Sequence, residues 1–108
     1  MTQLEFIEQI IKEKEAVILD ANDKIWSYAE LPYEETRSSA LLCSILESEG
    51  FTVETGVAEI PTAFVARYVV GTGKPVMGIL GEFDALATLS QKAGCTVKDP
   101  VQNGGSGH

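Results

Sequence analysis

The chain has 108 residues, which is enough for one small domain with a hydrophobic core and too few for two. Sixteen Asp and Glu against eight Lys and Arg give a formal net charge of −8. An acidic surface of this kind repels phosphate backbones and anionic lipids, so neither nucleic acid nor a membrane is expected as a partner. The N-terminus does not resemble a signal peptide, and no apolar run approaches the roughly 20 residues that span a bilayer. We therefore expect a cytoplasmic protein.

A long amphipathic helix is predicted at the start of the chain. Thr2 and Glu5 match a capping box, in which a hydroxyl and a carboxylate satisfy free backbone N–H groups of the first turn. Apolar residues then recur at mostly three- and four-residue spacing and define one face: Phe6, Ile7, Ile10, Ile11, Val17, Ile18, Ala21 and Ile25. Pro32 ends this helix or follows its end, because proline disfavours helical geometry in the residue before it.

A second helix is predicted over residues 34–49. Its inward face would consist of Leu41, Leu42, Ile45 and Leu46. Gly50 stands where a left-handed C-terminal cap is favoured, and Phe51 would fold back onto Leu46.

Three strands are predicted next. Residues 51–55 alternate in polarity, residues 63–70 form the second strand, and the glycine-rich residues 71–74 form a turn. Residues 76–81 are almost continuously apolar, which is typical of a strand covered on both faces. Residues 91–108 are rich in glycine and are predicted to be a loop. The fold class is therefore α/β, with two helices, three strands and a long loop.

Two carboxylates at the end of the third strand form a candidate site. Glu82 and Asp84 are two residues apart, so their side chains point the same way if the strand continues through them. Neighbouring carboxylates repel each other unless a cation or a hydrogen-bonded base lies between them. Alternatively, both side chains simply face solvent where the strand ends.

The remaining metal-binding residue types do not form a site by their spacing alone. His108 is the only histidine, whereas a metal site needs three or four ligands. The Gly-Gly-Ser-Gly stretch before it is also typical of a linker to a purification tag. Cys43 and Cys95 lack metal-type spacing and are expected to be reduced thiols.

The stretch Gly-Glu-Phe-Asp-Ala-Leu at residues 81–86 resembles the first active-site segment of metal-dependent amidohydrolases of the aminoacylase/carboxypeptidase superfamily. Within that superfamily the chain is most similar to the branch that acts on aminobenzoyl-glutamate. Upstream features agree in order and spacing: Ile25-Trp26, Pro32, Glu34-Glu35, residues 46–53 and residues 60–64. The resemblance implies that residues 1–108 are the N-terminal portion of a single zinc-peptidase-like α/β catalytic domain, incomplete and without the inserted dimerisation domain.

The resemblance also implies an activity. The parent enzyme would cleave the amide bond of p-aminobenzoyl-glutamate or a similar N-acyl amino acid, as a homo-oligomer or a two-subunit complex. Two divalent metal ions, zinc or manganese, would polarise the carbonyl and activate a water, and a downstream glutamate would act as general base. The 108-residue chain would lack most of these groups, so we expect it to bind no metal ion and to be inactive alone.

Site residues follow from the same resemblance. Many relatives carry His-x-Asp at this strand end, whereas this chain has Glu82 at the histidine position and Asp84 at the aspartate position. In the aminobenzoyl-glutamate branch, metal ligands come from a later His-x-Cys-x-His element, and His108 matches its first histidine. Asp84 would thus orient a metal ligand, Glu82 would lie at or next to the metal, and His108 would bind it.

Two other functions remain open. One is a dipeptidase of the same superfamily. The other is a truncated, non-catalytic acidic module for binding or regulation, which would associate through an unpaired sheet edge.

Overall fold

The computed structural model describes residues 1–108 and begins with the predicted long helix, α1 (Gln3–Tyr28). Its capping box is present: the Glu5 N–H donates to Thr2 Oγ1 at 3.1 Å, and the Thr2 N–H donates to Glu5 Oε2 at 2.7 Å. The helix ends at Ala29, which adopts a left-handed conformation (φ 45°) and donates its N–H to the Ile25 carbonyl. The last helical residue, Tyr28, lies four positions before Pro32, in agreement with the prediction that Pro32 ends the helix or follows its end.

The second helix, α2 (Thr36–Ser48), begins two residues later than predicted. Its C-terminal cap is confirmed, since Gly50 has a φ of 93°. The Gly50 N–H donates to the Glu47 carbonyl, and the Phe51 N–H donates to the Leu46 carbonyl, both at 3.0 Å. These two bonds form a Schellman motif, which satisfies carbonyls left free at the helix end.

The first two predicted strands form a hairpin, with shorter strands than expected. The strands β1 (Thr52–Thr55) and β2 (Phe64–Arg67) are antiparallel, and Thr52 pairs with Arg67. A short 3₁₀ turn, η1 (Val57–Glu59), lies in the connection between them. Residues 71–74 form a bend where the turn was predicted.

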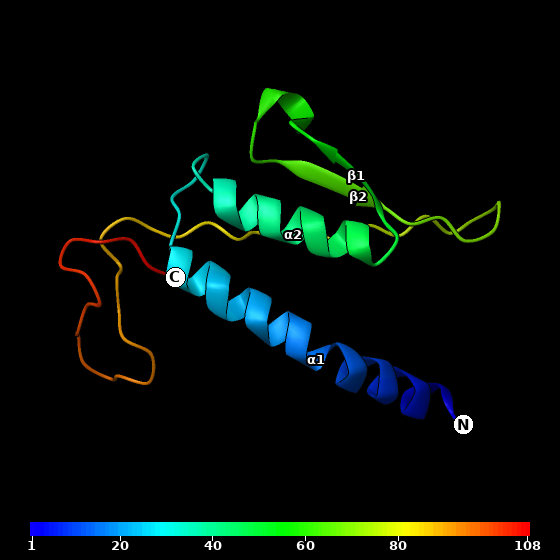
Figure 1. The fold of residues 1–108 in the computed structure, drawn as a ribbon, viewed down its shortest axis with the longest axis horizontal. Coiled ribbons are helices and arrows are strands. Elements are labelled where there is room, and N and C mark those ends of the chain that lie inside the picture. Colours follow the sequence, from blue (N-terminus) through cyan, green and yellow to red (C-terminus); the bar gives the residue numbers. More distant parts are fainter.

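The prediction of a third strand over residues 76–81 is wrong for this structure. The segment has no regular secondary structure and runs behind α2 in Figure 1, drawn in yellow. Its side chains are almost fully exposed, with Val76 at 93% and Ile79 at 96%. A strand requires a neighbouring strand to pair its backbone N–H and C=O groups. The two-stranded sheet contains only β1 and β2, so the apolar segment has no such partner.

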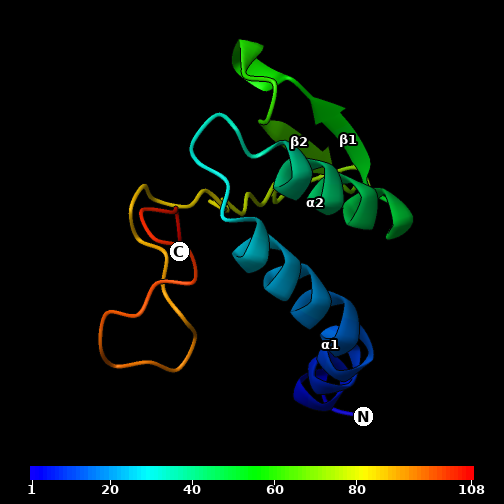
Figure 2. The ribbon, with the colours of Figure 1, turned by 60° about the vertical axis from the view of Figure 1, so that its left-hand side comes forward.

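The elements are arranged with α2 between α1 and the hairpin (Figures 1 and 2). Two contacts connect α1 to α2, one at each end of α2. The Arg37 guanidinium lies 3.8 Å from the centre of the Tyr28 ring, and Lys14 Nζ lies 2.6 Å from Glu49 Oε2. The result is a small α/β arrangement of two helices and a two-stranded antiparallel sheet.

The core is small and lies where α1, α2 and the later loop meet. The buried apolar residues are Ala21, Cys43 and Ala85, and most of the predicted apolar face of α1 is exposed. The predicted inward face of α2 is half-buried. The radius of gyration is 16.9 Å, whereas a compact domain of this length has about 13 Å. No helix of the structure combines the length and the apolar character needed to cross a membrane.

Candidate functional site

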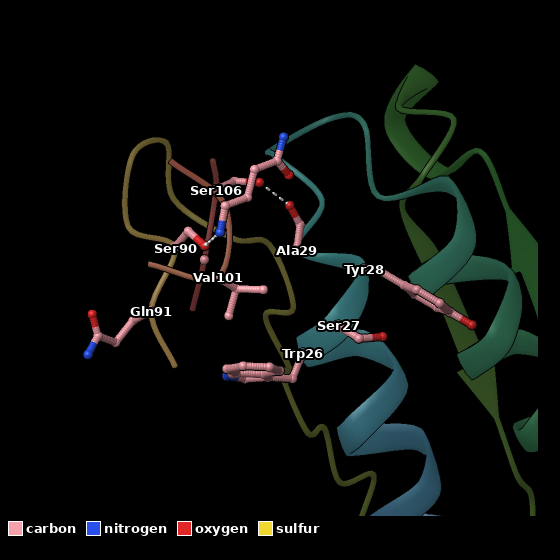
Figure 3. A pocket seen from close by; sticks show the side chains of 10 residues that line it. Trp26, Ser27, Tyr28, Ala29, Ser90, Gln91, Val101 and Ser106 are labelled. Atoms are coloured by element: carbon pink, nitrogen blue, oxygen red, sulfur yellow. Dashed lines mark hydrogen bonds between the residues drawn. The ribbon is translucent and has the colours of Figure 1, made fainter. Parts of the chain in front are cut away.

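The C-terminal segment packs against the loop that follows residue 84. Leu86 and Gly107 form an isolated antiparallel bridge, with N–H to carbonyl distances of 2.8 and 3.0 Å in the two directions. The Ser90 N–H donates to the Gly105 carbonyl at 3.0 Å. The Ser106 hydroxyl donates to the Ala29 carbonyl at the end of α1 (Figure 3). The glycine-rich stretch therefore has specific contacts, which a flexible linker to a tag would lack.

His108 and Glu82 are brought together by this packing. They line one open pocket of about 380 Å³, together with Asn22, Ile25, Trp26, Leu42, Gly81 and Phe83. His108 Nε2 lies 3.1 Å from the Ile25 carbonyl oxygen. Because a carbonyl oxygen only accepts hydrogen bonds, Nε2 carries the proton and Nδ1 of a neutral ring keeps its lone pair.

Asp84 is placed differently from Glu82. It is half-buried and does not line the pocket that Glu82 and His108 share. On one side Phe83 packs against Phe64, with ring centroids 6.1 Å apart. On the other side Ala85 is fully buried, and its N–H donates to the Glu30 carbonyl at 2.7 Å. These contacts hold Asp84 in place at the end of the extended segment.

A carboxylate that the sequence analysis missed, Glu30, lies at the start of α2. Glu30 Oε1 accepts from the Ser38 N–H and the Ser38 hydroxyl, each at 2.7 Å. Glu30 Oε2 accepts from the Arg37 N–H at 3.0 Å and from the Thr36 hydroxyl at 3.4 Å. Burial alone would raise the pKa of Glu30, but these hydrogen bonds outweigh burial and lower it below its ordinary value.

The signal that could have revealed Glu30 is the absence of a good cap residue before α2. Glu35 occupies the N-cap position and makes no side-chain hydrogen bond to the helix. Its carboxylate instead accepts from the Thr62 hydroxyl at 2.8 Å. The free N–H groups of a first helical turn require acceptors, so a carboxylate from outside the helix was to be expected.

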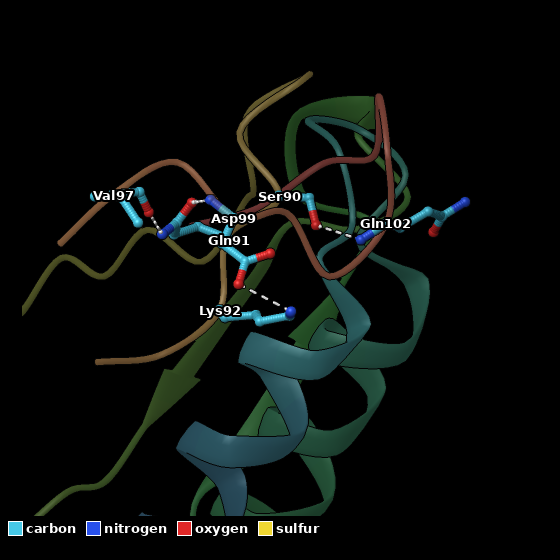
Figure 4. A network of polar contacts seen from close by, with 6 residues as sticks. All are labelled: Ser90, Gln91, Lys92, Val97, Asp99 and Gln102. Atoms are coloured by element: carbon cyan, nitrogen blue, oxygen red, sulfur yellow. Dashed lines mark hydrogen bonds and ion pairs between the residues drawn. The ribbon is translucent and has the colours of Figure 1, made fainter. Parts of the chain in front are cut away.

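A second pocket of about 200 Å³ lies between the end of α1 and the last loop. Trp26, Tyr28, Ser90, Val101 and Ser106 are among the residues that line it (Figure 3). Its loop wall is held by polar contacts of the side chains at positions 90–92 (Figure 4). The Gln91 amide donates to the Val97 carbonyl at 2.7 Å, and Gln91 Oε1 accepts from the Asp99 N–H at 2.9 Å. Lys92 Nζ lies 2.9 Å from Asp99 Oδ2, and the Gln102 N–H donates to Ser90 Oγ at 3.0 Å.

The donors in the Glu82–His108 pocket are of types that zinc and manganese accept, an imidazole nitrogen and a carboxylate. They are two, whereas a catalytic zinc has three protein ligands. Nowhere in the chain do three or more His, Cys, Asp and Glu side chains lie close enough to hold a metal ion. The pocket therefore offers two such donors, fewer than a catalytic zinc requires.

The two cysteines are free, and neither lines this pocket. Burial raises the pKa of the Cys43 thiol, and the neighbouring Glu47 acts in the same direction, while a hydrogen bond with Ser39 opposes them. A buried, protonated thiol is a poor nucleophile. Cys95 is exposed.

Comparison with known proteins confirms the resemblance seen in the sequence. The chain is 47% identical over 103 residues to one of the subunits of the p-aminobenzoyl-glutamate hydrolase of Escherichia coli. These residues make up 95% of the chain and 21% of that protein, so the chain spans about a fifth of the relative's length. No protein-family model matches the chain. No solved structure matches it either.

Proposed function

We propose that the chain is one part of a metal-dependent amidohydrolase that cleaves p-aminobenzoyl-glutamate or a similar N-acyl amino acid. The observation that carries this proposal is the 47% identity, over 95% of the chain, to a relative that is named as part of a p-aminobenzoyl-glutamate hydrolase. In this proposal the chain is the N-terminal portion of a zinc-peptidase-like catalytic domain. The two free cysteines suit the reducing cytoplasm, which we propose as its location.

The pocket between Glu82 and His108 would form one wall of the active site. His108 and Glu82 would supply two of the groups that hold zinc or manganese, and the other ligands would come from polypeptide outside these 108 residues. When bound, the metal would polarise the substrate carbonyl and activate a water. Asp84, held between two packed neighbours and outside the pocket lining, would orient a metal ligand. The relative is named as a subunit, so we also propose an assembly of more than one chain, either a homo-oligomer or a two-subunit complex.

The test is hydrolysis by the product of the complete gene that encodes this chain. We expect release of p-aminobenzoate and glutamate from p-aminobenzoyl-glutamate, loss of that activity in a chelator, and its return with zinc or manganese. Glu82→Gln and His108→Ala should each reduce the rate, whereas Glu34→Gln, an exposed carboxylate outside the pocket, should not. Faster hydrolysis of simple dipeptides would instead assign the protein to the dipeptidases of the same superfamily.

A non-catalytic binding module is the second candidate, and the exposed apolar surface favours it. Residues 76–80 and much of α1 present large apolar side chains to solvent, and exposed patches of this kind mark surfaces that bind other polypeptides. The gene separates the two candidates. If codon 108 begins a His-x-Cys-x-His element, the hydrolase is supported. If a stop codon directly follows codon 108, the binding module is supported.

A further inference from the structure

The C-terminal end of α1 is in contact with every segment that carries a candidate site residue. The Ile25 carbonyl bonds to the His108 ring, the Ala29 carbonyl accepts from the Ser106 hydroxyl, and the Glu30 carbonyl accepts from the Ala85 N–H. The Ile25 carbonyl also accepts from the Ala29 N–H, whereas the carbonyls of Ala29 and Glu30 lie beyond the last helical residue and bond only outside the helix. The position of this short stretch therefore determines the positions of Glu82, Asp84 and His108 relative to one another.

Within this stretch, Tyr28 contacts Arg37 of α2 through its ring, and Glu30 is hydrogen-bonded to α2 through its carboxylate. Its carboxylate accepts four hydrogen bonds from the first turn of α2, three of them at 3.0 Å or less. The helix N-terminus also carries a partial positive charge, which attracts an ionised carboxylate. The backbone of Glu30 is thus fixed relative to α2, and with it the carbonyl that holds Ala85.

Ala85 transmits this constraint to the carboxylates. It is 0% exposed and directly follows Asp84, and the bridge from Leu86 to Gly107 begins at the next residue. A shift of the Glu30 carbonyl would therefore move Asp84 on one side and the His108 segment on the other. Residues 76–80 are exposed and pair with no strand, so they provide no alternative support for the segment that carries Glu82 and Asp84.

We propose that Glu30 is a positioning residue of the active site: its carboxylate on α2 and its carbonyl on Ala85 together set the geometry of Asp84, Glu82 and His108. This inference rests on the proposed hydrolase function for its catalytic meaning, although the positioning itself is a property of this chain. A misplacement of about 1 Å in a catalytic group costs on the order of 100-fold in rate. Glu30 would thus influence catalysis without contact with the substrate.

The first experiment measures amide hydrogen exchange in the 108-residue chain with Glu30→Gln, which keeps the shape of the side chain and removes its charge. We expect exchange at the Ala85 and Ser38 amides to accelerate about tenfold or more, while amides in the middle of α1 keep their wild-type rates. Glu34→Gln serves as the matched control and should leave all rates unchanged. Equal acceleration at all amides would show a general loss of stability and would overturn the proposal, as would unchanged exchange at Ala85.

Circular dichroism first establishes that each variant retains its helices. If Glu30→Gln is unfolded, Glu30→Asp takes its place, because it keeps the charge and shortens the reach of the carboxylate by one methylene group. In the complete hydrolase, Glu30→Gln should lower kcat about tenfold or more and leave KM within about twofold. A wild-type product without hydrolase activity would refute the proposed function, whereas the exchange experiment still decides the role of Glu30. Unchanged kcat in an active Glu30→Gln enzyme would overturn the positioning role.

Discussion

Glu82 and His108 line the same pocket, although they lie 26 positions apart in the chain. The bridge between Leu86 and Gly107 brings their two segments side by side, and the Ile25 carbonyl holds the imidazole against α1. A carboxylate and a histidine thus converge on a wall that contains Trp26 and Phe83. This convergence depends on backbone hydrogen bonds of Leu86, Gly107 and Ile25 and not on pairing within the β1–β2 sheet.

Gly107 is the first residue to test, because the bridge leaves no room for a side chain there. A Cβ at this position would lie 2.2 Å from the Leu89 carbonyl oxygen and 2.7 Å from its carbon. We expect Gly107→Ala to break the bridge and to lower the free energy of unfolding by about 1–3 kcal/mol, measured by urea denaturation. Gly73→Ala is the control, since nothing lies within 4 Å of a Cβ there. Equal stability of the two variants would contradict the packing described for Gly107.

Asp84 can be tested in the complete gene product. If Asp84 orients a metal ligand, Asp84→Asn should lower metal affinity or the hydrolysis rate by about 10- to 100-fold. Affinity is measured by competition with a chelator and the rate by release of p-aminobenzoate. Asp23→Asn, an exposed change on α1, is the matched control. Wild-type values in the Asp84 variant would remove Asp84 from the site.

The pH dependence of stability should show the effect of Glu30. The pKa of Glu30 is lowered in the folded chain, so its contribution is fully present above the unfolded value, about 4.3, and is lost as the pH falls through the folded pKa. We expect Glu30→Gln to be less stable than wild type at pH 7 and the two to converge as the pH falls through the lowered pKa of folded Glu30. Urea denaturation across this range measures the effect. Parallel curves for wild type and Glu30→Gln would contradict it, and Glu34→Gln should retain the wild-type decline.

The helices could be predicted from the sequence because their signals are local. The Thr2–Glu5 box and the Gly50 cap depend on residues within one turn of the helix end, and both are present in the structure. The state of residues 76–81 could not be predicted in this way. A strand forms hydrogen bonds with neighbouring strands, and the pattern of one segment does not specify those neighbours. The apolar run indicates that the segment would need neighbouring strands and covered faces to form a strand, but it does not specify whether they are present.

Only part of the candidate site could be predicted, because some of its residues belong to a local motif and others are defined by long-range contacts. Glu82 and His108 stand out by residue type and by the family resemblance, and the structure places both at one pocket. Asp84 stands out equally but lies outside the lining of that pocket. Glu30 has no motif of its own, because its hydrogen bonds cross from the end of one helix to the start of another. The weak N-cap at Glu35 indicates that α2 needs an acceptor from elsewhere, but only the placement of the two helices identifies Glu30 as that acceptor.

Calorimetry with zinc tests the ligand count of the 108-residue chain. Two donors face the pocket, fewer than the three protein ligands of a catalytic zinc. We therefore expect no tight, stoichiometric binding, and we expect His108→Ala to give the same titration as wild type. A site with nanomolar affinity that His108→Ala abolishes would show that this chain supplies further ligands.

The exposed residues 76–80 should make the isolated chain associate with itself. Val76 and Ile79 are more than 90% exposed in a segment with no strand beside it, and unpaired apolar edges recruit other chains. We expect the average mass from sedimentation equilibrium to rise with concentration for the wild type. Ile79→Lys should suppress this rise, because a charge on the segment opposes burial against a second copy. Thr72→Lys adds the same charge at an exposed position in the preceding bend and should leave the association largely in place. If both lysine variants suppress the rise equally, net charge rather than the apolar segment controls association; a wild type that stays monomeric at all concentrations would contradict the prediction outright.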